Sequence, residues 1–148
     1  MKILKIKSFC KINLSLKIIK KLNNGYHSIK SLITFCKIYD IISIGPIQGP
    51  KDKITFSGKF KKGISVKSNT ITKTLYLLRK KKLILNNVFK IDIQKNIPHG
   101  SGLGGGSTNA ASLLNFLNLK MNLKLKKKEL IKIGNRVGFD VPICLENK

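Results

Sequence analysis

Hydrophobic and polar residues alternate along the first part of the chain, as they do in strands that bury one face of a sheet. Every second residue from Ile12 to Ile18 is apolar, and lysine, asparagine or serine fills the positions between. This alternation predicts a half-buried strand. The turn signal at residues 23–25 then leads into a second apolar stretch over residues 29–38. Further strands are expected over residues 40–44 and 53–56, so the amino-terminal half is predicted to be a sheet.

Apolar residues at helical spacing replace this alternation in later segments. Asn69 is suited to cap a helix that carries Ile71, Leu75 and Leu78 on one face. The basic end of that helix, residues 79–82, is expected to be a solvated terminus that suits the negative end of the helix dipole. Two more helices are expected, with apolar faces formed by Ala110, Ala111, Leu113, Leu114 and Leu117 in one and by Leu130, Ile133 and Val137 in the other.

The most distinctive stretch runs from Pro98 to Ala111, directly after a predicted strand over residues 88–95. Five of the twelve glycines fall within residues 98–106, the glycine loop, and a helix is expected to start near Ser107, which can cap it. Glycines adopt positive φ and bring backbone N–H groups close to a ligand, and the helix would aim the positive end of its dipole at the same point. The stretch therefore predicts a phosphate cradle rather than a flexible linker.

Three familiar glycine-rich motifs do not fit. Gly100, Gly102 and Gly105 satisfy the dinucleotide-binding pattern, but the neighbouring segments form no obvious βαβ unit and no acidic residue follows at the expected distance. A Walker loop places lysine and then serine or threonine after its last glycine, whereas Ser107 follows Gly106 directly. Protein kinases also carry H-R-D and D-F-G motifs, and the sequence has neither.

The chain has 148 residues, enough for one domain, and a formal charge of +24 at pH 7. Such a charge alone would indicate nucleic acid or another anionic surface. Arg79 and Arg136 are, however, the only arginines, whereas proteins that read phosphates and bases usually exploit the bidentate guanidinium. Abundant lysine, isoleucine and asparagine indicate an A/T-biased coding sequence, which makes a nucleic-acid partner less favoured. A basic nucleic-acid-binding module and a non-functional gene remnant stay open as alternatives.

The cysteines and the amino terminus indicate a cytosolic protein. Cys10, Cys36 and Cys144 are odd in number and form no C-x-x-C pair, so we expect reduced, largely buried thiols. Lysines interrupt the apolar residues 1–16, which leaves no signal peptide, and no stretch is long enough to cross a bilayer. We therefore expect a cytoplasmic protein without a membrane partner.

Phosphate chemistry at the glycine loop would need a cation and a carboxylate near the nucleophile. Of the six acidic residues, Asp140 is best placed to be partly buried, between Gly138 and Pro142. It is the candidate base, with the capping of a turn as the alternative. Lys11 lies in the apolar segment 9–16, where a surface lysine is less expected, although the polar face of a strand would explain it equally well.

Four segments, in this order, resemble the GHMP kinase superfamily: residues 9–14 (Phe-Cys-Lys-Ile-Asn-Leu), 24–27 (Asn-Gly-Tyr-His), 98–111 and 138–142 (Gly-Phe-Asp-Val-Pro). The resemblance implies that residues 1–148 form the amino-terminal, ATP-binding domain of such a kinase. That domain is α+β, of the ribosomal protein S5 domain 2-like type, with a mixed sheet packed against helices. The resemblance further implies that ATP and Mg²⁺ are used to phosphorylate a hydroxyl of a small molecule with a cytidine diphosphate moiety. Superfamily members have about twice this length, so we expect a carboxy-terminal half to be missing.

The resemblance also assigns roles to single residues. Asp140 would accept or orient the proton of the acceptor hydroxyl, and Lys11 would keep that carboxylate ionised and stabilise charge on the transferred phosphoryl group. The substrate would also contact Asn13, Tyr26 and His27, with the aromatic ring stacked on the base. ATP would be bound by Asn69 and Lys95, toward the adenosine, and by Pro98, Gly100, Ser101, Gly102, Leu103, Gly104, Gly105, Gly106, Ser107 and Thr108. Of these, Ser107 would lie near Mg²⁺.

Overall fold

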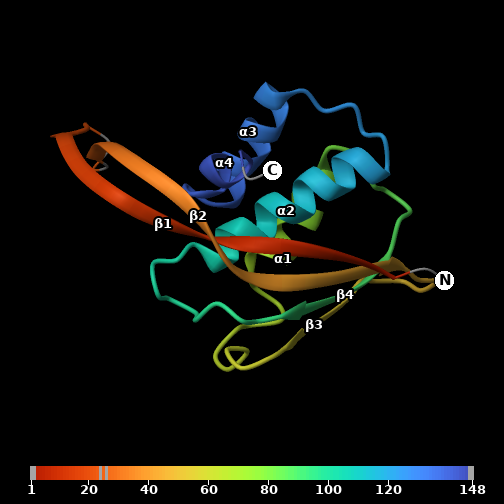
Figure 1. Cartoon of the computed structure of the whole chain (residues 1–148). Helices are drawn as coiled ribbons and strands as arrows, with labels where there is room; N and C mark the ends of the chain where they lie inside the picture. Colours follow the sequence, from red (N-terminus) through yellow and green to blue (C-terminus); the bar gives the residue numbers. More distant parts are fainter. Residues whose placement is uncertain (1–2, 24, 26, 147–148) are drawn as a thin grey trace.

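The computed structural model describes residues 3–23, 25 and 27–146, and in these ranges four strands form one sheet with four helices on one face (Figure 1). The strands are β1 (Leu4–Lys21), β2 (His27–Pro46), β3 (Lys53–Ser57) and β4 (Phe89–Gln94), in the sheet order β1-β2-β4-β3. β2 is antiparallel to β1 and β4, whereas β3 and β4 are parallel. The helices are α1 (Thr70–Lys80), α2 (Gly105–Lys120), α3 (Lys127–Val137) and α4 (Val141–Cys144). The predicted α+β fold with a mixed sheet is confirmed.

β1 and β2 form a long hairpin whose free end extends beyond the helices (Figure 1). The segments expected as separate strands over residues 29–38 and 40–44 are one continuous strand. Toward the free end of the hairpin, the side chains of Leu14, Leu16 and Ile18 are each more than half exposed. The prediction of a half-buried strand is therefore wrong for this part of β1, because the helices cover the other end of the hairpin.

The core lies between the sheet and the helices. Asn69 caps α1 as expected: its Oδ1 accepts a hydrogen bond from the Thr72 N–H at 3.0 Å, and the Thr72 hydroxyl accepts one from the Asn69 N–H. The predicted apolar faces are buried, and the fully buried side chains include Ile42, Ile71, Leu75, Leu78, Ile91, Ile93, Leu113, Leu114, Leu117 and Ile133. Cys10 and Cys144 are also buried, as expected, whereas Cys36 is partly exposed. No helix within the described ranges has the length and apolar character needed to span a membrane.

Of two predicted details at helix ends, one is wrong, and the other is right for Lys80, Lys81 and Lys82, which are exposed, but wrong for Arg79. α2 begins at Gly105 with Gly104 as its N-cap residue, so Ser107 lies inside the first turn and does not cap the helix. The reason is that Gly104 adopts the left-handed region, at φ 68°, and starts the helix earlier than a serine cap would. Arg79 is not part of a solvated terminus, because its guanidinium donates hydrogen bonds to both carboxylate oxygens of Asp52, at 2.7 and 2.8 Å. This pair ties the end of α1 to the segment before β3.

Gly58 lies where the fold has no room for a side chain. A Cβ atom there would lie 2.7 Å from the carbonyl oxygen of Lys95 and 2.8 Å from its nitrogen, and φ is +85°. We expect Gly58→Ala to lower the free energy of unfolding by about 1 to 3 kcal/mol more than Gly63→Ala does, because of this overlap. Gly63 is the matched control, with φ at +84° and no atom within 4 Å of its Cβ position. Urea unfolding measures the difference, and equal midpoints would contradict the expectation.

Candidate active site

The glycine loop joins the end of β4 to the start of α2 and turns sharply. Gly100, Gly102 and Gly104 all have positive φ, at 73°, 77° and 68°, which glycine adopts without strain. The hydrogen bond from the Thr108 N–H to the Gly104 carbonyl, at 2.8 Å, is the first one of α2. The N–H groups that precede it in the first turn have no partner within the helix, and they lie at the positive end of the helix dipole. The start of α2 is therefore built to bind an anion.

A hollow of about 270 Å³ lies over this helix start. Its lining comes from the glycine loop, the first turn of α2 and two side chains that other segments supply. The lining residues are Lys95, Pro98, His99, Gly100, Ser101, Gly102, Gly104, Gly105, Gly106, Ser107 and Asp140. The structure thus brings most of the residues predicted to bind ATP together with the predicted base.

Lys11 and Asp140 meet beside the glycine loop although they are 129 positions apart in sequence. The backbone N–H of Lys11 donates to the Leu103 carbonyl at 2.9 Å, which holds β1 against the loop. The Lys11 Nζ lies 3.0 Å from Oδ2 of Asp140 and 3.4 Å from Oδ1 of Asn13. Lys11 is only 3% exposed, so the alternative of an ordinary surface position on the strand is wrong. A lysine buried to this extent needs a charged partner, and Asp140 supplies it.

Asp140 stands at the start of α4 but does not cap that helix with its side chain. Its carboxylate instead contacts Lys11. The side chain is 48% exposed, and the residue lines the hollow. The geometry therefore does not favour the alternative of a turn cap. Burial raises the pKa of the nearby Cys144 thiol to about 12, and the negative charge of Asp140 acts in the same direction, against the opposing charge of Lys11. Cys144 is thus a neutral thiol near pH 7 and adds no charge to the site.

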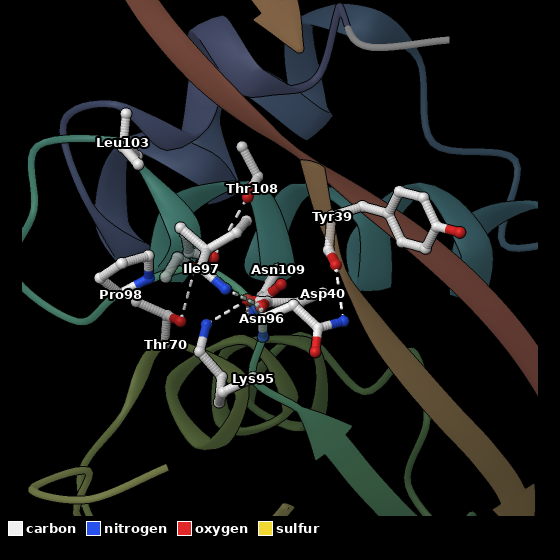
Figure 2. A network of polar contacts seen from close by, with 12 residues as sticks. Tyr39, Asp40, Thr70, Lys95, Asn96, Ile97, Pro98, Leu103, Thr108 and Asn109 are labelled. Carbon is white, nitrogen blue, oxygen red and sulfur yellow. Dashed lines mark hydrogen bonds and ion pairs between the residues drawn. The ribbon is translucent and has the colours of Figure 1, made fainter. Parts of the chain in front are cut away.

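A second lysine, Lys95, reaches the hollow from the end of β4, where Asp40 of β2 holds its ammonium group (Figure 2). Both side chains are buried. The Asp40 carboxylate also accepts hydrogen bonds from the N–H groups of Asn96 and Ile97, at 2.7 and 2.9 Å, and from the Asn109 amide at 3.0 Å. The sequence pattern predicts a strand at Asp40 and indicates no further role for this residue. One signal in the sequence could have indicated this role: Asp40 is one of only six acidic residues and stands at the start of an apolar strand.

The other predicted residues lie outside this cluster. Asn69 lines a separate hollow at the start of α1, and the hydroxyl of the adjacent Thr70 donates to the Gly106 carbonyl at 2.7 Å, which joins α1 to α2. His27 pairs across the hairpin at its exposed free end. Tyr26 lies outside the described residues. The structure therefore brings the residues of the predicted phosphate side together. Among the described residues, Asn69 and His27, predicted to contact the adenosine and the cytidine, lie apart from them.

The groups around the hollow fit a ligand that carries phosphates. A Cβ atom at Gly104 would lie 3.2 Å from Cε of Lys11, and one at Gly105 would lie 3.4 Å from Nζ of Lys95, so both lysines reach the start of α2. Two ammonium groups and a helix start favour negative charge at the same place. Within the described ranges, no group of three His, Cys, Asp or Glu side chains could hold a metal ion. Ser107, which lines the hollow, offers a hydroxyl of the kind that binds Mg²⁺ beside phosphates.

Residues 69–148 match the family of GHMP kinases N terminal domain, and the chain belongs to this family. Two similar curated proteins both carry the name 4-diphosphocytidyl-2-C-methyl-D-erythritol kinase. The protein from Pelagibacter ubique is 48% identical over 137 residues, which are 93% of this chain and 48% of that protein. The protein from Caldicellulosiruptor saccharolyticus is 38% identical over 140 residues, 95% of this chain and 47% of that protein. The chain spans about half the length of the curated relatives it matches.

Solved structures show the same fold. A crystal structure of 4-(cytidine 5'-diphospho)-2C-methyl-D-erythritol kinase matches with a TM-score of 0.74 at 24% identity, over 96% of this chain and 48% of that one. Mevalonate pyrophosphate decarboxylase from Streptococcus pyogenes matches with a TM-score of 0.68 at 15% identity, over 97% of this chain and 45% of that one. The mixed sheet with helices on one face is thus an architecture that both of these proteins contain in part of their length.

Proposed function

We propose that this chain is the ATP-binding half of a 4-diphosphocytidyl-2-C-methyl-D-erythritol kinase. Such an enzyme phosphorylates a hydroxyl of 4-diphosphocytidyl-2-C-methyl-D-erythritol in the non-mevalonate route to isoprenoid precursors. The observation that carries the proposal is the contact between Lys11 and Asp140 beside the glycine loop. It puts a cation and a carboxylate next to a phosphate-binding helix start, as phosphoryl transfer to a hydroxyl requires. The names of the curated relatives support the choice of substrate.

In the proposed reaction, the glycine loop and the first turn of α2 bind the ATP phosphates through backbone N–H groups. Asp140 orients the acceptor hydroxyl and takes up its proton while the hydroxyl oxygen bonds to the γ-phosphorus. The bond from that phosphorus to the bridging oxygen breaks, and ADP leaves. Lys11 stabilises the negative charge on the transferred group. Ser107 is the proposed protein ligand of Mg²⁺, which neutralises phosphate charge when bound.

The remaining assignments concern the two ends of the ligands. Asn69, beside the hollow at the start of α1, is proposed to lie toward the adenosine of ATP. Asn13, Tyr26 and His27 are proposed to contact the cytidine side of the acceptor. The position of Asn13 supports its proposed contact with the acceptor. Its Oδ1 lies 3.4 Å from Nζ of Lys11, next to the proposed reaction centre.

A carboxy-terminal half is the proposed partner of this chain. The relatives are about twice as long, and a second domain would supply the part of the substrate pocket that the described residues do not form. The free end of the hairpin offers a surface for it, because several large apolar side chains there are more than half exposed. They are Leu14, Leu16, Ile18, Ile19, Ile29 and Leu32. Exposed apolar clusters of this kind mark surfaces that a partner covers.

MgATP is expected to stabilise the chain against thermal unfolding. At about a hundred times the dissociation constant, binding to the folded state alone adds about 2.7 kcal/mol, which corresponds to a rise in Tm of about 5 to 10 °C. Differential scanning fluorimetry with MgATP, with Mg²⁺ alone and with ATP plus a chelator measures this rise. No rise with MgATP at any concentration would contradict the proposal.

The nucleic-acid alternative predicts a different response, and the charge of +24 is the observation that favours it. Affinity for a short single-stranded RNA should then fall steeply as salt rises, because counterion release drives such binding. Stabilisation by MgATP at a formed pocket should depend far less on salt. Tight, salt-sensitive RNA binding without a response to MgATP would support the alternative.

A further inference from the structure

The Asp40 carboxylate is buried and fully hydrogen-bonded. Its Oδ1 accepts from the N–H groups of Asn96 and Ile97, and its Oδ2 accepts from the Lys95 ammonium and the Asn109 amide (Figure 2). All four partners donate, which is the arrangement that suits an ionised carboxylate, an acceptor without a proton to give. An enclosed carboxylate with four donors strongly resists displacement, because removing it would leave an ammonium buried without a partner.

These four donors come from the parts of the fold that form the phosphate site. Asp40 lies on β2, Asn109 lies in the second turn of α2, and the other three are consecutive residues that lead from β4 into the glycine loop. The side chain of Ile97 supports the helix start directly, since a Cβ at Gly105 would lie 3.1 Å from its Cγ2. One carboxylate therefore fixes where the glycine loop begins and where α2 stands relative to it.

The position of Lys95 gives this anchor a role in ligand binding. Its Nζ lies 3.4 Å from the Cβ position of Gly105 and lines the hollow over the first turn of α2. This position favours a contact of Lys95 with the phosphates of the nucleotide rather than with its adenosine. Lys11 reaches the same turn at Gly104, where its partner Asp140 is half exposed. Lys95 thus lines the hollow with an enclosed carboxylate as its partner, whereas Lys11 lies beside the hollow and its partner Asp140 is accessible.

We propose that Asp40 is a positioning residue of the phosphate site, which holds the Lys95 ammonium beneath the start of α2 and fixes the glycine loop through Asn96 and Ile97. The inference rests on the proposed function, since it takes the hollow to bind nucleotide phosphates. Asp40 does not touch the ligand in this arrangement. It acts indirectly, because it orients the Lys95 ammonium and fixes the backbone that leads into the glycine loop.

The variant Asp40→Asn tests the inference against Asp92→Asn. Asp92 is a matched control because it loses the same charge, also lies in the sheet and accepts hydrogen bonds from the hydroxyls of Thr55 and Ser57 at 2.7 Å, without lining the hollow. Isothermal titration compares MgATP with adenosine, which lacks phosphates. Asp40→Asn is expected to weaken MgATP binding by about tenfold to a hundredfold, the range of a charge-assisted hydrogen bond, and to spare adenosine. Asp92→Asn is expected to spare both ligands.

Two outcomes would overturn the inference in a folded Asp40→Asn protein: an unchanged affinity for MgATP, or equal losses for MgATP and adenosine. If Asp40→Asn does not fold, the double variant Asp40→Asn/Lys95→Met removes both buried charges, a replacement that proteins commonly tolerate. It is expected to show the same selective loss. A folded double variant with the original MgATP affinity would refute the proposal.

Amide hydrogen exchange without nucleotide separates this inference from the proposed function. Asp40→Asn is expected to speed exchange at Asn96 and Ile97, whose N–H groups donate to Asp40, whereas Asp92→Asn should not. Unchanged exchange would overturn the role of Asp40 even in a chain that binds ATP. If the unmodified chain does not bind MgATP but Asp40→Asn loosens the loop, the proposed function fails and the positioning of the loop by Asp40 stands.

Discussion

In a chain completed by a second domain, Asp140→Asn is expected to lower turnover by about 10² to 10⁴-fold, the usual contribution of a positioned acid or base. Asparagine has the same size and still offers an oxygen to the Lys11 ammonium, which lies 3.0 Å from Oδ2 in the unmodified site. It cannot take up the proton of the acceptor hydroxyl. The completed protein would join residues 1–148 to the carboxy-terminal half of the Pelagibacter ubique relative. The assay would follow ADP release that depends on 4-diphosphocytidyl-2-C-methyl-D-erythritol.

Glu146→Gln is the control for this change. It also replaces a carboxylate by an amide, six positions further along the chain, where Glu146 forms an exposed ion pair with Lys127 at 2.6 Å. Exposed pairs contribute at most about 1 kcal/mol, so turnover should stay near that of the unmodified protein. MgATP affinity should change little in either variant, since the proposed role of Asp140 is toward the acceptor. Equal turnover of the two variants would remove Asp140 from the mechanism.

The surroundings of the acidic residues explain why Asp140 is the candidate among six. Each of the other five carboxylates contacts a partner elsewhere in the fold, and none of them lines the hollow. The pairs are Asp40 with Lys95, Asp52 with Arg79, Asp92 with the hydroxyls of Thr55 and Ser57, Glu129 with the Lys126 N–H, and Glu146 with Lys127. Asp140 differs because it lines the hollow, with 48% of its side chain exposed and Lys11 beside it. In a chain of charge +24, a hollow with so few accessible carboxylates favours anionic ligands.

The features that the sequence predicted well have local signals. Asn69 stands three positions before Thr72, and this spacing is enough to form the capping box that the structure shows. The cluster of glycines likewise indicates a loop with positive φ angles, and Gly100, Gly102 and Gly104 have them. Ser107 was a misleading local signal, since a serine before an apolar helical pattern looks like a cap. A left-handed Gly104 can start the helix earlier, and no local pattern distinguishes the two.

The features that the sequence did not predict depend on strand order. Asp40 and Lys95 meet because β2 and β4 are neighbours, and Asp52 meets Arg79 because the segment before β3 passes the end of α1. Neither neighbourhood is encoded in the periodicity of a single segment. Lys11 and Asp140 are likewise far apart in sequence, by 129 positions. Only the resemblance to a known family predicted that they act at one site. The geometry now gives that connection a physical basis, since the two side chains are in contact.

Gly104→Val is expected to weaken MgATP binding by about tenfold to a hundredfold, because a displaced N–H group or ammonium weakens charge-assisted hydrogen bonds to the phosphates, each of which contributes about 1.5 to 3 kcal/mol. Gly104 has φ 68°, a conformation that a β-branched residue rarely adopts. The atoms nearest to the new Cβ would belong to Lys11. The new atom would lie 3.2 Å from Cε of Lys11 and 3.4 Å from its Cβ, so the start of α2 or the buried lysine must shift. Either shift moves the N–H groups at the start of α2 relative to the Lys11 ammonium, although both are proposed to contact the phosphates.

Gly63→Val separates this local effect from backbone strain. Gly63 has φ +84°, so valine is strained there too, but its Cβ would meet no atom within 4 Å and the residue does not line the hollow. Both variants should unfold at lower urea concentration than the unmodified chain, whereas only Gly104→Val should lose MgATP affinity by isothermal titration. A folded Gly104→Val protein that binds MgATP as well as Gly63→Val would show that the ligand does not depend on the start of α2. The phosphate cradle would then have to be sought elsewhere in the fold.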